Sequence, residues 1–308
     1  MGNSFIFIFA GHETSAGTLH YAMIHLAMHP TIQAHLQSDI DSIVGSRPPS
    51  EWSYTVDLRN LYNSMVGAVL NETLRVTPVV VRSPKVNRGG PKQFTIDGRT
   101  ATLPGNGTYI HLDVIGSNYN PRHFPTKPSK ITPGKTDIAE FVPERWLTNK
   151  PNGNINCTAT SSTKSNSAAA ANGGVIDGLE NASFEAAGSL FRPQKGAWIP
   201  FADGARACPG RRFVQVEITA VLAVIFRLYT VELDVRRLKT ERYPDGIGDE
   251  RLAGMTGDEK RGVYEKAKDR AWERVRAAVP TISLRMEGEG VPLRFVRRGR
   301  ERFGGLDL

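Results

Sequence analysis

The loop at residues 201–210 constrains this chain more than any other feature, because it places one cysteine immediately before a strongly apolar helix. Gly204 permits a turn with positive φ, and Gly210 lets the backbone approach a flat ligand. Residues Arg211–Tyr229 are predicted to form the helix, whose N-terminal dipole and free N–H groups stabilise an anionic sulfur on Cys208. A lone cysteine beside a glycine turn is usually buried and inert, so the neighbouring residues decide between a structural thiol and a metal-binding thiolate.

Cysteine usage and charge limit the classes of function. The two cysteines, Cys157 and Cys208, lie in unlike surroundings, which argues against a disulfide and favours a reducing compartment. Neither has a second thiol at zinc-ligand spacing, so a metal site would depend on a single thiolate. The net charge of +8 comes from scattered basic residues. This pattern predicts no nucleic-acid binding and favours an acidic electron-donor protein as a partner.

Helical periodicity covers the first part of the chain. Residues Asn3–His29, Pro30–Val44 and Asp57–Val76 carry apolar side chains at helical spacing. The apolar run Phe5–Ala10 is shorter than the roughly 20 residues that a membrane span needs, and we expect no anchor or signal peptide in this chain. A helix that starts so near residue 1 has nothing upstream to cap or bury it, so we expect a preceding portion to be missing.

Short β-branched or aromatic runs, separated by glycine and proline, predict small sheets further along the chain. The predicted strands are Val79–Val81, Gln93–Ile96, Thr108–Leu112 and Val231–Val235, with a hairpin formed by Ile282–Met286 and Pro292–Val296 around Gly288–Gly290. Residues 150–188 are dominated by Asn, Ser, Thr, Ala and Gly, which predicts a low-complexity, disordered insertion. Residues 238–278 are expected to form a second, charged insertion with a helix at Asp258–Ala277.

The cysteine loop resembles the haem-binding signature FxxGxRxCxG of the cytochrome P450 family at every defined position. The resemblance implies that Cys208 is the axial ligand of a haem iron, a position from which a thiolate donates electron density and favours O–O cleavage. It also implies that Phe201 shields the sulfur and that Arg206 pairs with a haem propionate. Together with Gly204 and Gly210, these residues form the expected cofactor-binding set.

A second motif, Ala10–Ser15, is similar to the distal-helix pattern [A/G]Gx[D/E]T[T/S] of the same family. The resemblance implies catalytic roles for three of its residues. Gly11 makes room for dioxygen, Thr14 steadies the bound dioxygen through its hydroxyl, and Glu13 helps to relay protons. Without the cysteine loop, the same residues would indicate only a polar cluster on a buried helix.

Two more motifs concern the core. Glu72 and Arg75 have the i, i+3 spacing at which side chains meet on a helix face. The run from Pro143 to Trp146 resembles the family's PERF motif, with a conservative change from Phe to Trp. By resemblance, Arg145 joins the other two residues in a buried structural triad that holds the core around the haem.

The resemblance implies a mainly α fold with small β-sheets, in which residues 1–308 form a partial cytochrome P450 domain running from the distal helix through the haem-binding loop to a C-terminal hairpin. The implied activity is haem-thiolate monooxygenation, with haem b as cofactor and electrons from an NADPH-dependent flavoprotein reductase. The substrates are dioxygen and a small apolar organic molecule. The expected pocket is lined by Phe5, Ile6, Val79–Val81 and the tip at Gly288–Gly290.

Two alternatives remain open on the sequence. One is a family member that rearranges peroxides, although such chemistry does not need the Thr14 hydroxyl. The other is a truncated, non-catalytic fragment or an incomplete gene model, which the start inside a helix favours. A full-length eukaryotic relative is expected at the endoplasmic reticulum membrane, with the part represented here on the reducing, cytoplasmic side.

Overall fold

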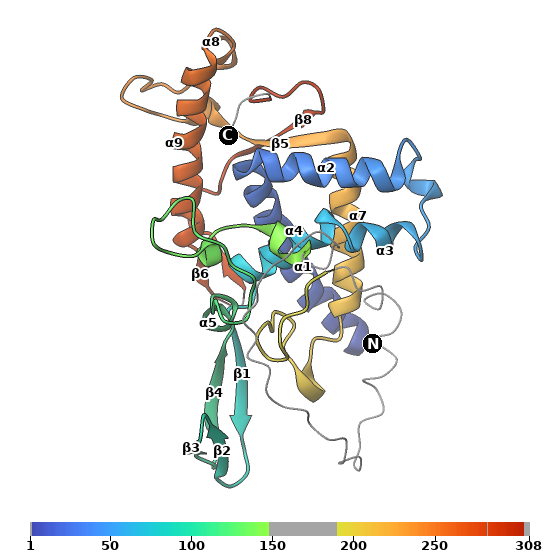
Figure 1. Cartoon of the computed structure of the whole chain (residues 1–308), viewed down its shortest axis with the longest axis vertical. Coiled ribbons are helices and arrows are strands. Elements are labelled where there is room, and N and C mark those ends of the chain that lie inside the picture. Colours follow the sequence, from blue (N-terminus) through green and yellow to red (C-terminus); the bar gives the residue numbers. More distant parts are fainter. Residues whose placement is uncertain (1, 148–189, 282, 305–308) are drawn as a thin grey trace.

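The structure is a computed structural model that describes residues 2–147, 190–281 and 283–304 (Figure 1). The described part is rich in helices and has small two-stranded antiparallel sheets, which confirms the predicted fold class. The predicted low-complexity insertion at 150–188 lies outside the described residues. Among those residues, no helix combines the length and the apolar character needed to cross a membrane.

The elements follow the chain in a simple order. The helices are α1 Gly2–Met28, α2 Pro30–Val44, α3 Asp57–Tyr62, α4 Met65–Val76, α5 Val114–Asn118, α7 Arg211–Leu228, α8 Asp249–Ala253 and α9 Gly257–Arg276. The strands are β1 Arg82–Asn87, β2 Lys92–Ile96, β3 Arg99–Leu103, β4 Thr108–Asp113, β5 Tyr229–Leu233, β6 Val279–Pro280, β7 Leu284–Arg285 and β8 Leu293–Arg297.

Four helices pack around one hydrophobic core. The second half of α1 lies against α2, α4 and α7, and Figure 1 shows these helices crossing at the centre of the molecule. Leu26 of α1, Leu36 of α2, Val69 of α4 and Leu222 of α7 are all fully buried in that core. This packing provides most of the helical stability, because helices in proteins are stabilised mainly by tertiary packing of their apolar faces.

The predicted helix over 57–76 is divided into α3 and α4. Ser64 lies between the two helices, and its side chain accepts a hydrogen bond from Val66 N and so caps the start of α4. The chain turns sharply here. A Cβ atom on Gly67 would lie only 1.8 Å from the carbonyl oxygen of Tyr62, so the corner requires glycine.

The prediction of a strand at Val79–Val81 is wrong. The segment is largely buried, but its carbonyl groups bond to two different elements instead of one partner strand. Val79 O accepts from Leu284 N at 2.7 Å, and Val81 O accepts from Val114 N at 3.2 Å. Regular pairing starts only at β1, which forms a long arm with β4 that carries the β2–β3 hairpin (Figure 1).

The predicted hairpin around Gly288–Gly290 is also wrong. β7 pairs with β6, whereas β8 pairs with β5. The physical reason lies in the loop between β7 and β8, which α9 holds from one side. Arg274 donates to Gly290 O and forms an ion pair with Glu289 at 2.9 Å. The loop therefore packs along α9, and the two strands that it joins separate.

The charged region at 238–278 contains α8 and α9, and the helix predicted at Asp258–Ala277 is confirmed within one residue at each end. Thr256 and Glu259 form a capping box at the start of α9. Tyr264 of α9 donates to Ala27 O, and Trp272 packs against His25 and His29. The helix thus braces the buried half of α1, while the status of this region as an insertion stays a prediction.

Candidate functional site: a cysteine loop facing the distal helix

The Cys208 loop closes through its own backbone. Cys208 N donates to Phe201 O at 2.8 Å, and Ala207 N donates to Gly204 O at 2.9 Å. Gly204 has φ of +78°, the left-handed conformation that the sequence predicted for this position. The guanidinium carbon of Arg211 lies 5.7 Å from the centre of the Phe201 ring. These contacts present an exposed free thiol immediately before the first turn of α7.

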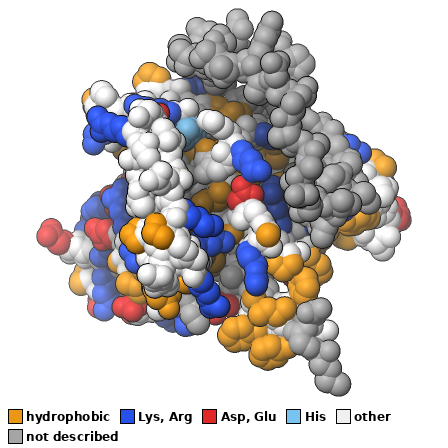
Figure 2. All heavy atoms as spheres, turned by 90° about the horizontal axis from the view of Figure 1, so that it is seen from below, with side chains coloured by type: hydrophobic (Ala, Val, Ile, Leu, Met, Phe, Trp, Pro, Cys, Tyr) orange, Lys and Arg blue, Asp and Glu red, His pale blue; other side chains and the backbone are white. Residues whose placement is uncertain are grey.

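The N-terminal end of α1 lies close to this thiol. A Cβ atom built on Gly210 would be 3.8 Å from the Cys208 sulfur and 3.8 Å from a ring carbon of Phe7. The side chains of residues 5–9 are apolar and largely exposed, from 47% for Phe7 to 72% for Ile8. Figure 2 shows hydrophobic side chains gathered at this end of the molecule, beside a hollow whose border carries basic side chains and an acidic one. Exposed apolar patches are typical of binding or interaction surfaces.

The three residues of the expected distal motif lie on the next turns of α1. The Thr14 hydroxyl donates to Ala10 O at 2.8 Å, one helical turn earlier. Glu13 is half-buried and accepts a hydrogen bond from the Ser283 hydroxyl at 2.5 Å. A Cβ atom on Gly11 would meet nothing within 4 Å, so there is open space beside this position. The structure therefore places Gly11, Glu13 and Thr14 on the same part of α1.

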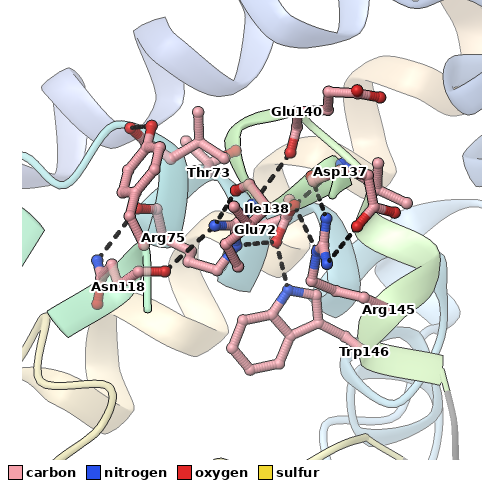
Figure 3. Close-up of polar contacts among 12 residues, drawn as sticks. Glu72, Thr73, Arg75, Asn118, Asp137, Ile138, Glu140, Arg145 and Trp146 are labelled. Atoms are coloured by element: carbon pink, nitrogen blue, oxygen red, sulfur yellow. Dashed lines mark hydrogen bonds and ion pairs between the residues drawn. The ribbon is translucent and has the colours of Figure 1, made fainter. Parts of the chain in front are cut away.

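The structure brings Glu72, Arg75 and Arg145 together in the core (Figure 3). Arg75 donates to both carboxylate oxygens of Glu72, at 2.8 Å and 2.7 Å. Arg145 Nε donates to Glu72 Oε1 at 3.0 Å. The side chains of Glu72 and Arg75 are 0% exposed, and that of Arg145 is 2% exposed. The arginines also donate to backbone carbonyl groups, among them Ile138 O from Arg75 and Asp137 O from Arg145.

The Glu72 carboxylate stays charged in this surrounding. Burial alone would raise the pKa of the Glu72 carboxyl, but the charges of Arg75 and Arg145 and the Val142 N–H outweigh burial, so its pKa lies below the ordinary value. The same carboxylate raises the pKa of the Arg75 guanidinium against the effect of burial. Both partners are therefore ionised. The cluster ties α4 to the segment before the cysteine loop, which makes it a structural lock.

Comparison with known proteins decides the family. The sequence model of the family described as Cytochrome P450 matches residues 1–248, which is most of this chain. The chain belongs to the cytochrome P450 family. A cytochrome P450 monooxygenase of Arthrobotrys oligospora is 31% identical over 249 residues, covering 79% of this chain and 36% of that protein. Cytochrome P450 3A2 of Rattus norvegicus is 27% identical over 232 residues, covering 75% of this chain and 34% of that protein.

A third relative adds a biosynthetic context of its own. The phomenoic acid biosynthesis cluster cytochrome P450 monooxygenase of Leptosphaeria maculans is 25% identical over 240 residues, covering 75% of this chain and 34% of that protein. The chain thus spans about a third of the length of the curated P450 relatives that it matches. The family match ends near the start of α8, so α9 and the strands after it lie beyond the matched residues.

Membership of the P450 family implies a haem cofactor, and the residues present fit one. Cys208 supplies a sulfur of the type that ligates haem iron, and this sulfur is exposed. Gly210 has no side chain between the sulfur and Phe7. Arg206 is exposed on the same loop and has no ion pair among the described residues, so its guanidinium is available to a propionate. The exposed apolar side chains on α1 suit the face of a macrocycle.

Sequence reasoning missed two polar contacts of this P450 site. The indole N–H of Trp146 donates to Glu72 Oε2 at 2.8 Å, which makes Trp146 a fourth member of the buried cluster. The signal was available, because Trp has a ring donor that Phe lacks. The hydrogen bond from Ser283 to Glu13 joins residues 270 positions apart, and no local sequence pattern predicts it.

Proposed function

We propose that this chain forms the haem-binding and oxygen-activating part of a haem-thiolate monooxygenase. The observation that carries the proposal is the exposed Cys208 thiol at the start of α7, facing the exposed apolar end of α1. The net reaction combines an organic substrate RH, dioxygen, two electrons and two protons into ROH and water. Haem b, when bound, supplies the oxygen-activating chemistry, while the protein supplies the ligand, the proton path and an apolar pocket.

The proposal gives each part of the site a task. Cys208 would hold the haem iron as a thiolate, which the N-terminal dipole of α7 would stabilise. Phe201 covers the sulfur, and Gly204 and Gly210 give the loop its shape. Arg206 holds a propionate through a charge-assisted hydrogen bond. These roles agree with a closed loop and a thiol directed outwards.

On the opposite side, Gly11 leaves room for dioxygen because nothing fills the space beside it. The Thr14 hydroxyl has lone pairs left after it donates to Ala10 O, so it would be able to accept a hydrogen bond or, after rotation, to donate one within the open space beside Gly11. Glu13 holds or passes a proton through its carboxylate. Substrate is expected to contact Phe5 and Ile6, whose exposed side chains favour a small apolar molecule.

The electron donor is proposed to be an NADPH-dependent flavoprotein reductase. Exposed arginines lie on either side of Cys208 in the sequence, with Arg206 on the loop and Arg211 and Arg212 on the first turn of α7. A basic surface of this kind speeds encounter with an acidic partner. Location at the cytoplasmic side of the endoplasmic reticulum membrane stays a prediction from the resemblance to the family.

Ligand spectroscopy tests the proposed function. Residues 1–308 are expressed with haem supplied, reduced with dithionite and exposed to carbon monoxide. A red-shifted Soret band typical of thiolate ligation supports the proposal. Haem-free or aggregated protein would contradict it and favour a non-catalytic fragment. Cys208→Ala should abolish the band, whereas the matched control Cys157→Ser should keep it. Survival of the band in Cys208→Ala would refute the ligand assignment.

A further inference from the structure

The strongest unassigned contact of the site is the hydrogen bond from Ser283 to Glu13. Ser283 is 3% exposed and lies directly before β7, and its hydroxyl donates to Glu13 Oε1 at 2.5 Å. A buried hydroxyl needs a hydrogen-bond partner, and the Glu13 carboxyl oxygen supplies it. The bond thus joins the segment before β7 to the helix that carries Glu13.

The turn that carries Ser283 is held on α1 directly through Tyr21 and indirectly through Val79. Leu284 N donates to Val79 O at 2.7 Å, and Tyr21 Oη donates to Leu284 O at 3.5 Å. Val79 in turn packs on α1, since a Cβ atom on Gly17 would lie 3.4 Å from its side chain. Glu13, Gly17 and Tyr21 are spaced by four residues, so they share one face of the helix. The turn docks along this face.

The turn itself is closed around Ser283. The backbone N–H of Thr281 donates to Ser283 O at 3.1 Å, and its hydroxyl donates to the same oxygen at 3.2 Å. The position of Ser283 is thus determined by its own turn and by α1 together. A long, half-buried glutamate has several rotamers, and a bond to a fixed hydroxyl selects one of them.

We propose that Ser283 is a positioning residue that orients the Glu13 carboxylate for proton delivery. The inference rests on the proposed function of Glu13 as a proton carrier and adds the group that holds it. Ser283 binds Oε1, and no described residue forms a hydrogen bond with Oε2. This arrangement leaves the second oxygen to accept or release a proton beside Thr14, the next residue of the helix. Ser283 itself takes no part in the chemistry.

The first test measures how the haem-loaded full chain divides its electrons between product and hydrogen peroxide. Ser283→Ala should raise the peroxide fraction about fivefold, the factor that loss of one hydrogen bond typically produces, while the carbon monoxide spectrum stays unchanged. Ser283→Thr keeps the hydroxyl and should restore coupling. A purely structural role would lower the amount of folded enzyme without changing this ratio. An unchanged ratio in Ser283→Ala therefore overturns the proposal.

Thr281→Ala is the matched control, because Thr281 is exposed and its hydroxyl contacts the same turn without reaching Glu13. It should leave the peroxide fraction at the wild-type value. An equal rise in both variants would mean that disturbance of the turn explains the effect, and the role of the Ser283 hydroxyl would be refuted.

A second test needs neither haem nor turnover. A double-mutant cycle compares urea unfolding of wild type, Ser283→Ala, Glu13→Ala and the double variant. Direct contact predicts that the two changes are non-additive, by about threefold to tenfold in the unfolding equilibrium constant. Additive effects would overturn the contact even if the enzyme is active. Haem binding without any turnover by wild type would instead overturn the proposed function and the relay role with it, whatever the cycle shows.

Discussion

Trp146 donates its indole N–H to Oε2 of Glu72 at 2.8 Å, so the buried carboxylate binds an aromatic donor as well as two arginines (Figure 3). Oε2 accepts from Arg75 and Trp146, while Oε1 accepts from Arg75, Arg145 and the backbone N–H of Val142. Every lone pair direction of the carboxylate is therefore used. The PERF-like motif contributes two neighbouring donors to this cluster.

Trp146→Phe tests the value of that bond. Phenylalanine keeps the aromatic packing but removes the donor from a buried charge, which typically costs about 1.5 to 3 kcal/mol. We expect the free energy of unfolding to fall by this amount, plus a smaller cost for the lost ring volume. Chemical denaturation of the purified chain gives the measurement.

The matched control is Trp198→Phe. Trp198 packs against Trp146 with ring centres 5.0 Å apart, yet its buried N–H has no partner among the described residues. Its replacement removes similar volume without breaking a hydrogen bond. If Trp146→Phe is no more destabilising than Trp198→Phe, the bond to Glu72 contributes nothing to stability.

Glu72→Gln should be far more damaging than loss of a surface charge. The change leaves the Arg75 guanidinium in the core without its paired carboxylate and Arg145 with only Asp137 at 3.5 Å, and breaking a buried pair typically costs about 3 to 5 kcal/mol. Arg261→Gln provides the comparison, because its pair with Asp258 is exposed and should contribute less than about 1 kcal/mol. Equal unfolding midpoints for the two variants would show that the triad is not the lock that its geometry indicates.

The cysteine loop and α7 were predictable because their signals are local. Gly204 needs a positive φ, and the apolar run after Gly210 has helical periodicity. The meeting of Glu72 with Arg145 came only from family resemblance. Contacts that depend on tertiary packing were missed. Ser283 contacts Glu13 although 270 positions separate them in the sequence. β8 pairs with β5 and not with β7, which is nearer in the sequence, because α9 holds the loop between β7 and β8.

Two buried histidines predict loss of stability in mild acid. His25 Nε2 contacts the Thr77 hydroxyl at 3.1 Å, and the ring stacks on Phe141. Burial, followed by the charge of His29, lowers the pKa of His25 to about 3, and burial lowers the pKa of His29 to about 4. Both rings are neutral in the folded chain but take up protons in the unfolded chain below the ordinary value of 6.5.

The sign follows from this difference. The contribution of the two neutral rings to the free energy of unfolding is fully present above pH 6.5. It falls as the pH drops towards the folded pKa values, because the unfolded state binds more protons. At pH 5 each histidine should cost about 2 kcal/mol relative to neutral pH. His25→Phe should remove about half of the loss that the two histidines cause together, whereas the exposed control His111→Gln should remove none. Urea unfolding at pH 7.5 and pH 5 measures how much the free energy of unfolding falls between the two pH values. An equal fall in wild type and His25→Phe would refute the role of His25 in this loss of stability.

Gly11→Ala separates stability from function at one position. Gly11 lies inside α1 with a helical backbone, and an added Cβ would meet nothing within 4 Å. Alanine should therefore stabilise the haem-free chain by about 0.5 to 1 kcal/mol, since glycine is a poor helix former. If the open space beside Gly11 receives dioxygen, the same methyl group should weaken carbon monoxide binding to the reduced, haem-loaded chain.

Gly262→Ala is the matched control, because Gly262 is exposed on α9 with equally open surroundings and lies in a helix that the proposed site does not use. It should give a similar gain in stability and unchanged carbon monoxide affinity. Equal carbon monoxide affinity in both variants would remove Gly11 from the oxygen site while leaving its place in the helix intact.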